Sequence, residues 1–300
     1  MRLSMSRWLL SLVVVTLSLN GWASPAPAAD TPAGKAGAVK NTAAEKPEKP
    51  GADAPGSKLE KMLASAEDRY TAIQTQELQL SMEVLTIQAK AQQALKDPAK
   101  AREELEKPGG SKELRDYKAA MLACAAKWQG FEQKIQGLLS IIKPLEAQRD
   151  KAPAELQPRI DQLVSRTHEK HRAVQEKIAD CYDKVAAYKE ALQAYGAIYQ
   201  GLPEKQRASD RTLIEKLAGL CEKLKDYKRA LEFYMVTYKG KSEKDRNGDR
   251  KLSENLSRCY EKLGDMASAL DFAKKALATS PDDKGLKERV AKLEGSGSKK

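Results

Sequence analysis

The sequence predicts an all-α protein: a long antiparallel helical hairpin of the coiled-coil type, followed by a three-repeat α-solenoid. An apolar heptad stripe extends over most of residues 58–145, and sustained 3-4 spacing favours coiled-coil packing. A second pattern begins at Ile178, Leu217 and Leu256, so its period is 217 − 178 = 39 and 256 − 217 = 39 residues. A fixed period of this length is typical of stacked helical units, none of which can bury its apolar face alone.

Residues 1–28 have the pattern of an export signal. Arg2 and Arg7 precede an apolar run from Trp8 to Leu19, and small residues follow. The run is shorter than the about 20 residues that a membrane helix needs, so we expect no membrane span after cleavage. An uncleaved anchor is the alternative. Cleavage after Ala23 or Ala28 fits the small residues equally well.

Residues 29–57 are rich in Ala, Pro and Lys and contain few large apolar side chains. Such a segment cannot bury enough apolar surface to offset the entropy of ordering. We predict a disordered tether.

Residues 58–171 are predicted to form the helical hairpin. Asp97-Pro98 ends a first helix, Pro108-Gly-Gly110 forms a turn, and Ser111 starts a second helix. Folding back into an antiparallel pair is the simplest arrangement, but a bundle with later helices and self-association through a multi-chain coiled coil stay open. Only Glu77 interrupts the first stripe, which consists of Leu59, Leu63, Ala66, Tyr70, Ile73, Glu77, Leu80, Val84, Ile87, Ala91 and Ala94.

A weaker stripe follows the joint at Ala152-Pro-Ala154 and continues from Ile160 to Val185. Its helix continues from the hairpin into the first repeat. We therefore expect the two halves of the chain to be joined rigidly.

Residues 172–294 contain the three repeats, each read as two helices. In the third unit, helices at 252–263 and 266–279 flank a turn at Gly264-Asp265, and Pro281 closes the unit. With Tyr260, Ala269 and Ala276, this pattern resembles the tetratricopeptide repeat family. The resemblance covers units at about 172–205, 211–244 and 250–283, and the first two depart from it because Ala187 and Lys225 replace the turn glycine.

The repeats have a period longer than the family's usual 34 residues. Additional residues at 206–210 and 245–249 account for the difference. Leu286, Val290 and Leu293 predict a terminal capping helix, and residues 295–300 are expected to fray.

No catalytic arrangement is visible, so we expect a protein that is not an enzyme and has no cofactor. The two histidines, His168 and His171, have no zinc-signature spacing. A loop that starts at Asp245 has Arg250 where a calcium loop needs its turn glycine, and Glu254 comes too early to be the late glutamate. We therefore expect no metal site. Cys181, Cys221 and Cys259 lie within one residue of the same place in the first helix of each repeat and are predicted, with Cys124, to be free buried thiols.

The formal net charge of +11, from 53 basic and 42 acidic residues, is diffuse. Because no block of five like charges occurs, the sequence gives no support for nucleic-acid binding.

Charged residues recur at equivalent positions of the first repeat helices. The resemblance implies that these rows line a concave groove for a protein or peptide partner, and their acids favour a mixed-charge or basic segment. The alternative is a solvated face with local ion pairs. The candidate groove residues are Glu176, Asp180, Asp183, Lys184, Glu215, Glu222, Lys223, Glu254, Arg258, Glu261 and Lys262.

The order of signal, coiled coil and repeats is similar to that of periplasmic proteins that coordinate cell division and the envelope in Gram-negative bacteria. We therefore expect an exported, periplasmic interaction scaffold, or adaptor. The alternative function is a periplasmic holdase or assembly chaperone that uses the basic hairpin to hold unfolded clients.

Overall fold

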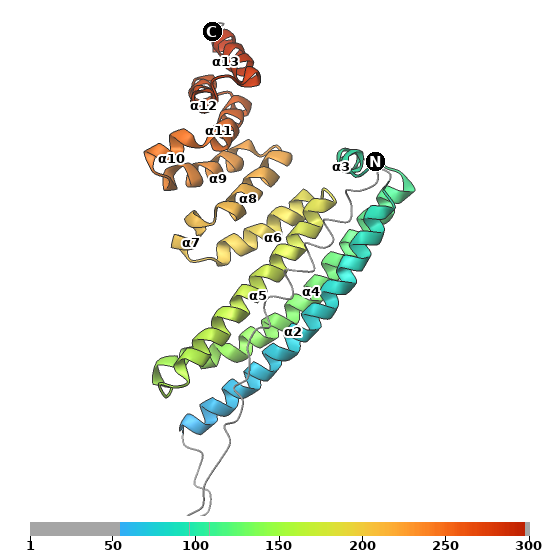
Figure 1. Cartoon of the computed structure of the whole chain (residues 1–300), viewed down its shortest axis with the longest axis vertical. Coiled ribbons are helices and arrows are strands. Elements are labelled where there is room, and N and C mark those ends of the chain that lie inside the picture. The colour runs from blue at the N-terminus through green and yellow to red at the C-terminus, as the bar shows by residue number, and fades with distance from the viewer. Residues whose placement is uncertain (1–54, 96, 108, 298–300) are drawn as a thin grey trace, which may run out of the picture. The chain divides into compact units, whose positions relative to one another are not determined.

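The computed structural model describes residues 55–95, 97–107 and 109–297. The predicted signal and the tether up to residue 54 lie outside this range. Every regular element in it is helical, which confirms the all-α fold class (Figure 1). The elements are α2 Pro55–Gln93, α3 Pro98–Leu105, α4 Lys112–Ala147, the 3-10 turn η1 Arg149–Lys151, α5 Gln157–Lys184, α6 Tyr188–Gly201, α7 Glu204–Ser209, α8 Arg211–Lys223, α9 Tyr227–Gly240, α10 Glu243–Gly248, α11 Arg250–Leu263, α12 Met266–Thr279 and α13 Lys284–Gly297.

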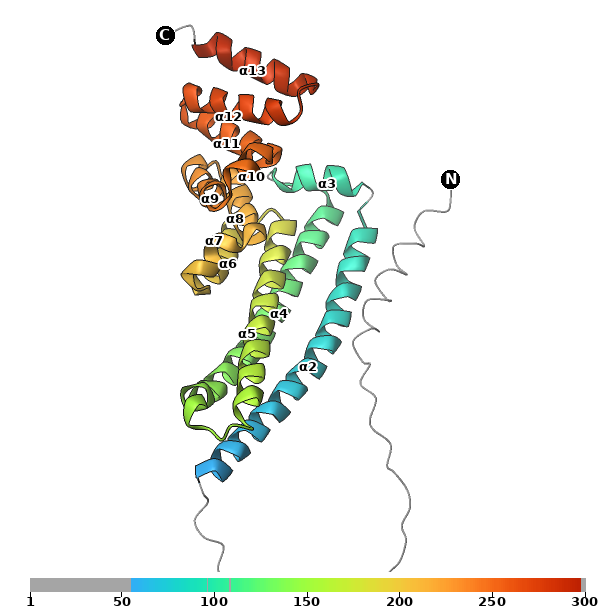
Figure 2. The ribbon, with the colours of Figure 1, turned by 60° about the vertical axis from the view of Figure 1, so that its left-hand side comes forward.

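Helices α2 and α4 form the predicted antiparallel pair, lying side by side (Figure 2). Lys134 donates to Gln76 at 2.9 Å, and Lys127 pairs with Glu83 at 2.8 Å, so the numbers rise along one helix as they fall along the other. Helix α2 begins at Pro55, three residues before the predicted boundary. At α4, the hydroxyl of Ser111 accepts from the backbone N–H of Leu114 and caps the helix start as expected.

Helix α5 is a third member of this group, so the bundle alternative describes the arrangement better than a hairpin alone. It packs along α4, and its buried Ile160, Leu163 and Val174 belong to the same core as the heptad residues of α2 and α4. The apolar stripe of α5 was correctly located, but its periodicity alone did not show which helix it would cover.

The second half of α5 also serves as the first helix of the first repeat. Ile178 and Cys181 pack into the three-helix core, whereas Ala179, one position away on the helix, packs against α6 and α8. One helix therefore has buried faces in both parts of the structure.

Glu77, which interrupts the heptad stripe, is held between two lysines of α5. Its side chain is 18% exposed and binds Lys170 and Lys177, the latter at 2.9 Å. Burial alone would raise the pKa of Glu77, but the hydrogen bonds from the two lysines outweigh it and lower the pKa. The carboxylate is thus a structural bridge between α2 and α5.

The repeats are helix pairs α5–α6, α8–α9 and α11–α12, and α13 covers the last pair. Leu286 and Leu293 of α13 are buried, as expected for a capping helix. The additional residues between units form the short helices α7 and α10. The last helix extends to Gly297, three residues into the segment expected to fray.

The turns inside the repeats lie at Ala186, Lys225 and Gly264, with φ of 58°, 61° and 85°. The prediction that Ala187 replaces the turn glycine is therefore wrong by one residue, because the 39-residue period places Ala186 there. Ala187 instead precedes α6 as its N-cap residue. Two of the three turns thus place a side chain in the left-handed region that favours glycine.

The turns provide a test of this backbone strain. Ala186→Gly and Lys225→Gly should each raise the free energy of unfolding by about 0.5–1 kcal/mol, because left-handed backbone costs an L-residue about 1–2 kcal/mol and added chain entropy offsets part of the gain. Gly264→Ala should lower it by about 1 kcal/mol. Urea denaturation measures all three. A loss of stability in the two glycine variants would contradict the account.

Candidate functional site

The repeats are joined by an arginine that recurs at the start of each first helix. Arg172, Arg211 and Arg250 each bind the glutamate four residues later: Glu176, Glu215 and Glu254. The same guanidinium groups also reach forward to an aspartate at the start of the next first helix, or of α13: Asp210, Asp249 and Asp283. Each aspartate accepts a hydrogen bond from the backbone N–H three residues later, at 3.0–3.1 Å. One carboxylate therefore caps a helix and holds the preceding repeat.

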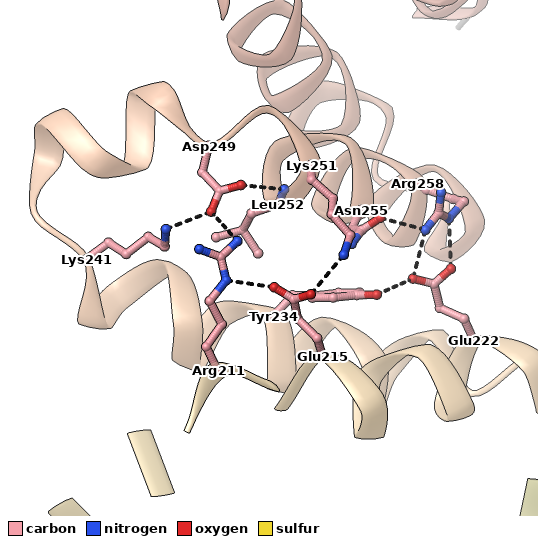
Figure 3. A network of polar contacts seen from close by, with 10 residues as sticks. All are labelled: Arg211, Glu215, Glu222, Tyr234, Lys241, Asp249, Lys251, Leu252, Asn255 and Arg258. Carbon is pink, nitrogen blue, oxygen red and sulfur yellow. Dashed lines mark hydrogen bonds and ion pairs between the residues drawn. The ribbon is translucent and has the colours of Figure 1, made fainter. Parts of the chain in front are cut away.

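The joint between the second and third repeats shows this arrangement in full (Figure 3). Asp249 lies 2.9 Å from Arg211 and 2.7 Å from Lys241, and it accepts from Leu252 N–H at 3.1 Å. Its side chain is only 9% exposed. Burial would raise the pKa of Asp249, but the hydrogen bonds from Lys241 and Leu252 outweigh it and lower the pKa.

A second row of acids binds cations of the next unit. Asp183 pairs with Lys223 at 3.0 Å, Glu222 with Arg258 at 2.8 Å, and Glu261 with Arg289 at 2.8 Å. These pairs cross from one first helix to the next, and the last one crosses to α13. They are contacts between repeats as much as features of a surface.

Two tyrosines at equivalent positions of the second helices donate hydrogen bonds to acids of the first helices. The hydroxyl of Tyr195 donates to Asp180, which also binds Lys216 at 2.9 Å, and that of Tyr234 donates to Glu222 at 2.8 Å. Burial and the neighbouring carboxylates raise the pKa of both tyrosines, so both hydroxyls stay protonated as donors.

The structure thus brings the predicted groove residues onto successive repeat helices, but pairs their acids with cations. All seven predicted acids, Glu176, Asp180, Asp183, Glu215, Glu222, Glu254 and Glu261, have a Lys or Arg partner within the chain. Of the predicted cations, Lys223 and Arg258 are partners in these pairs, and Lys184 and Lys262 are exposed. Binding of a basic segment to this face stays a prediction.

The second helices of the first two repeats flank an open hollow that was not predicted from the sequence. It lies between α6 and α9 over α8 and has a volume of about 810 Å³. Leu192, Leu217 and Leu224 contribute apolar lining, and the rings of Tyr199 and Phe233 meet edge to face at 5.7 Å. Other residues along it are polar: Lys189, Gln193, Gln200, Asp226 and Arg229.

The hollow exists where α6 has small side chains. Gly196 and Ala197 line it, and the 39-residue period aligns them with Met235 and Val236 of α9. A Cβ added at Gly196 would meet nothing within 4 Å. The sequence signal was therefore available as a small pair aligned with a large pair, but it lies on the second helices, whereas the predicted groove residues lie on the first helices.

The residues weighed for metal binding have other surroundings. Nε2 of His171 lies 3.1 Å from Glu132, His168 is exposed, and residues 243–248 form α10. Within the described part of the chain, no group of three His, Cys, Asp or Glu is placed to hold a metal ion.

The four cysteines are free and buried, as predicted. Burial raises the pKa of Cys181 and Cys221 to about 11 and that of Cys259 to about 12. These groups are therefore thiols rather than thiolates near neutral pH, and they pack as small apolar side chains.

Comparison with known proteins identifies the third repeat. Residues 252–287 match the family model described as Tetratricopeptide repeat. No curated protein matches the chain. Among solved structures, BtubC (BKLC) from P. vanneervenii is similar over 78% of this chain and 80% of that one, with 16% sequence identity and a TM-score of 0.34. No helix among the described residues has the length and apolar character needed to cross a bilayer.

The Asp249 joint gives the repeats a testable pH dependence. The pKa values of Asp249 and Glu215 are lower in the folded state than in the unfolded state. The two groups therefore add to the free energy of unfolding above their unfolded-state pKa values of about 4, and this contribution is lost as pH falls through the folded-state pKa values. Asp249→Asn keeps a capping side chain but removes this charge, so urea denaturation between about pH 7 and pH 3 should show a smaller loss of stability than in wild type.

A second variant separates the cap from the ion pairs. Asp249→Ala removes both and should cost about 2–3 kcal/mol at neutral pH, more than Asn at the same position. If wild type and Asp249→Asn lose the same stability on acidification, Asp249 does not make the proposed contribution.

Proposed function

We propose that this chain, which carries a tetratricopeptide repeat at residues 252–287, is a non-catalytic scaffold that binds another protein through its repeats. The tetratricopeptide repeat is typical of protein–protein interaction scaffolds. The single observation that carries the proposal is the hollow between α6 and α9. A partner inserts one or two large apolar side chains there and places polar groups along the rim.

The chemistry of the hollow supports this use. Its volume is within the range of about 300–1,000 Å³ that is common for ligand pockets, and an apolar lining with a few polar groups is their usual composition. Tyr and Phe rings are frequent anchors in protein interfaces. The acid rows of the first helices support a basic partner less well, because those acids already bind cations of the chain.

Filling the hollow tests the proposal. Gly196→Met with Ala197→Val copies the Met235-Val236 pair of α9 into α6. A displayed random-peptide library panned against wild type should yield binders with large apolar residues. Their Kd, measured by fluorescence anisotropy, should rise by about tenfold or more in the filled variant, while the helix keeps or gains stability because its glycine is replaced.

A matched control is available on α4. Gly137 is exposed, and a Cβ added there meets nothing within 4 Å, so Gly137→Met repeats the glycine-to-methionine part of the change away from the hollow. It should leave peptide affinity unchanged. Equal affinity in wild type and the filled variant would exclude the hollow as the binding site.

The proposal also places the scaffold in the periplasm of a Gram-negative bacterium, in cell-envelope or cell-division coordination. Its support is the pattern of residues 1–28, which lie outside the described range. Expression of the full chain in such a host should give a mature periplasmic protein that begins at Ser24 or Ala29, as determined by N-terminal sequencing. An intact Met1 in the cytoplasmic fraction would contradict export.

A holdase function is the second candidate. The observation that favours it is a set of exposed large apolar side chains on α2, namely Leu78, Met82 and Leu85. Such a surface can contact unfolded clients. If this candidate is right, replacing these three side chains by glutamine should reduce the ability of the chain to keep a reduced, unfolded test protein in solution.

A further inference from the structure

Three large apolar side chains lie exposed in a row on α2. Leu78, Met82 and Leu85 are 63%, 64% and 52% exposed. Their spacing of four and three residues places them on one side of the helix, opposite the side that packs on α4. Elsewhere in the described part of the chain, only Leu122 and Leu263 are large apolar residues of comparable exposure.

The row is part of a longer seam with heptad spacing. The positions that follow steps of four and three on this side of α2 are here named the outer seam. They are Thr71, Thr75, Leu78, Met82, Leu85, Ala89 and Gln92. The outer seam extends over roughly 30 Å of α2. It is distinct from the stripe that faces α4. All seven residues are exposed. Spacing of this kind is what a helix presents to a parallel or antiparallel helical partner.

The outer seam carries no charge, although 32% of the chain's residues are charged. Between Arg69 and Lys90 the charged residues of α2 are Glu77 and Glu83, and both are paired with lysines of neighbouring helices. Residues that flank the seam are Gln74, Gln79, Ser81, Thr86, Gln88 and Gln93.

The threonine hydroxyls along this part of α2 already have acceptors. Thr71 donates to the carbonyl of Glu67 at 3.0 Å, Thr75 to that of Thr71 at 3.3 Å, and Thr86 to that of Met82 at 2.8 Å. These hydroxyls can therefore be covered without leaving an unpaired donor, whose burial would cost about 1–3 kcal/mol. The surface suits a contact that excludes water.

We propose that the outer seam of α2 binds the outer seam of a second copy of this chain, forming a two-fold symmetric dimer. A charged partner would find no complementary charge on this face. Two copies of a chain with formal charge +11 meet no like-charge repulsion across the seam itself. The seam is also its own complement: in the antiparallel register that sets Met82 against Leu85 of the second copy, Leu78 lies against Ala89, so large and small residues alternate.

Sedimentation velocity of the full chain between about 1 and 200 µM tests the proposal. Wild type should shift from monomer towards dimer as concentration rises. A triple variant with Leu78→Gln, Met82→Gln and Leu85→Gln should raise the dimer dissociation constant by about 100-fold or more. At a concentration low enough for wild type to be monomeric, its circular dichroism and thermal midpoint should match those of wild type, because the replaced side chains are exposed in the monomer and Gln is a good helix former.

Two controls make the outcome specific. Leu263 is 46% exposed on α11, and Leu263→Gln should leave association unchanged. Met82→Cys should give a covalent dimer with a short bismaleimide, whereas wild type should not, since its own cysteines are buried.

Two results would overturn the dimer. One is association that survives in the triple variant. The other is a wild type that stays monomeric at the highest concentration. In that case, if wild type keeps a reduced, unfolded test protein in solution and the triple variant does not, the outer seam is a surface for unfolded clients. The seam and the hollow are on different helices, so failure of one proposal is distinguishable from failure of the other.

Discussion

The repeat array depends on one recurring contact, the guanidinium of a first-helix arginine bound to the capping aspartate of the next first helix. Arg172 and Arg211 reach aspartates 38 residues later, whereas Arg250 reaches one 33 residues later. The contact is the same although five residues are missing from the last connection. In the first two connections the short helices α7 and α10 come directly before the joint aspartate, so the same contact forms across connections of different length.

This contact couples charge to geometry. Each aspartate satisfies a free N–H at the positive end of a helix while it neutralises an arginine of the preceding unit. A single exposed ion pair contributes little, but Asp249 is nearly buried and has three partners. The same chemistry explains why rows of acids need not be a binding surface, because lysine and arginine side chains of the next repeat already bind them.

Much of the fold could be predicted because its determinants are local. The heptad stripe, the Ser111 cap, the Gly264 turn and the period of 39 each depend on nearby residues. The packing of α5 on α4 and the ion partners of Glu222 could not, because both depend on which helices meet in space. A row of glutamates looks alike in sequence whether it faces solvent or an arginine 36 residues later. The hollow was missed for a related reason: the space that Gly196 leaves is bounded by Phe233, which lies on another helix.

Because α5 is shared by the three-helix core and the first repeat, the two ends of the repeat array should differ in their resistance to unfolding. Melting the first repeat would strip Ile178 and Cys181 from the core shared with α2 and α4, so that end of the array is anchored to a much larger cooperative unit. At the other end, α13 packs on α12, and α12 packs on α11 of the same repeat, so neither helix belongs to the three-helix core. Loss of structure under heat, denaturant or mechanical pulling therefore starts at the C-terminal helices and travels towards α5, where it meets the three-helix core and stops until that core yields as a whole.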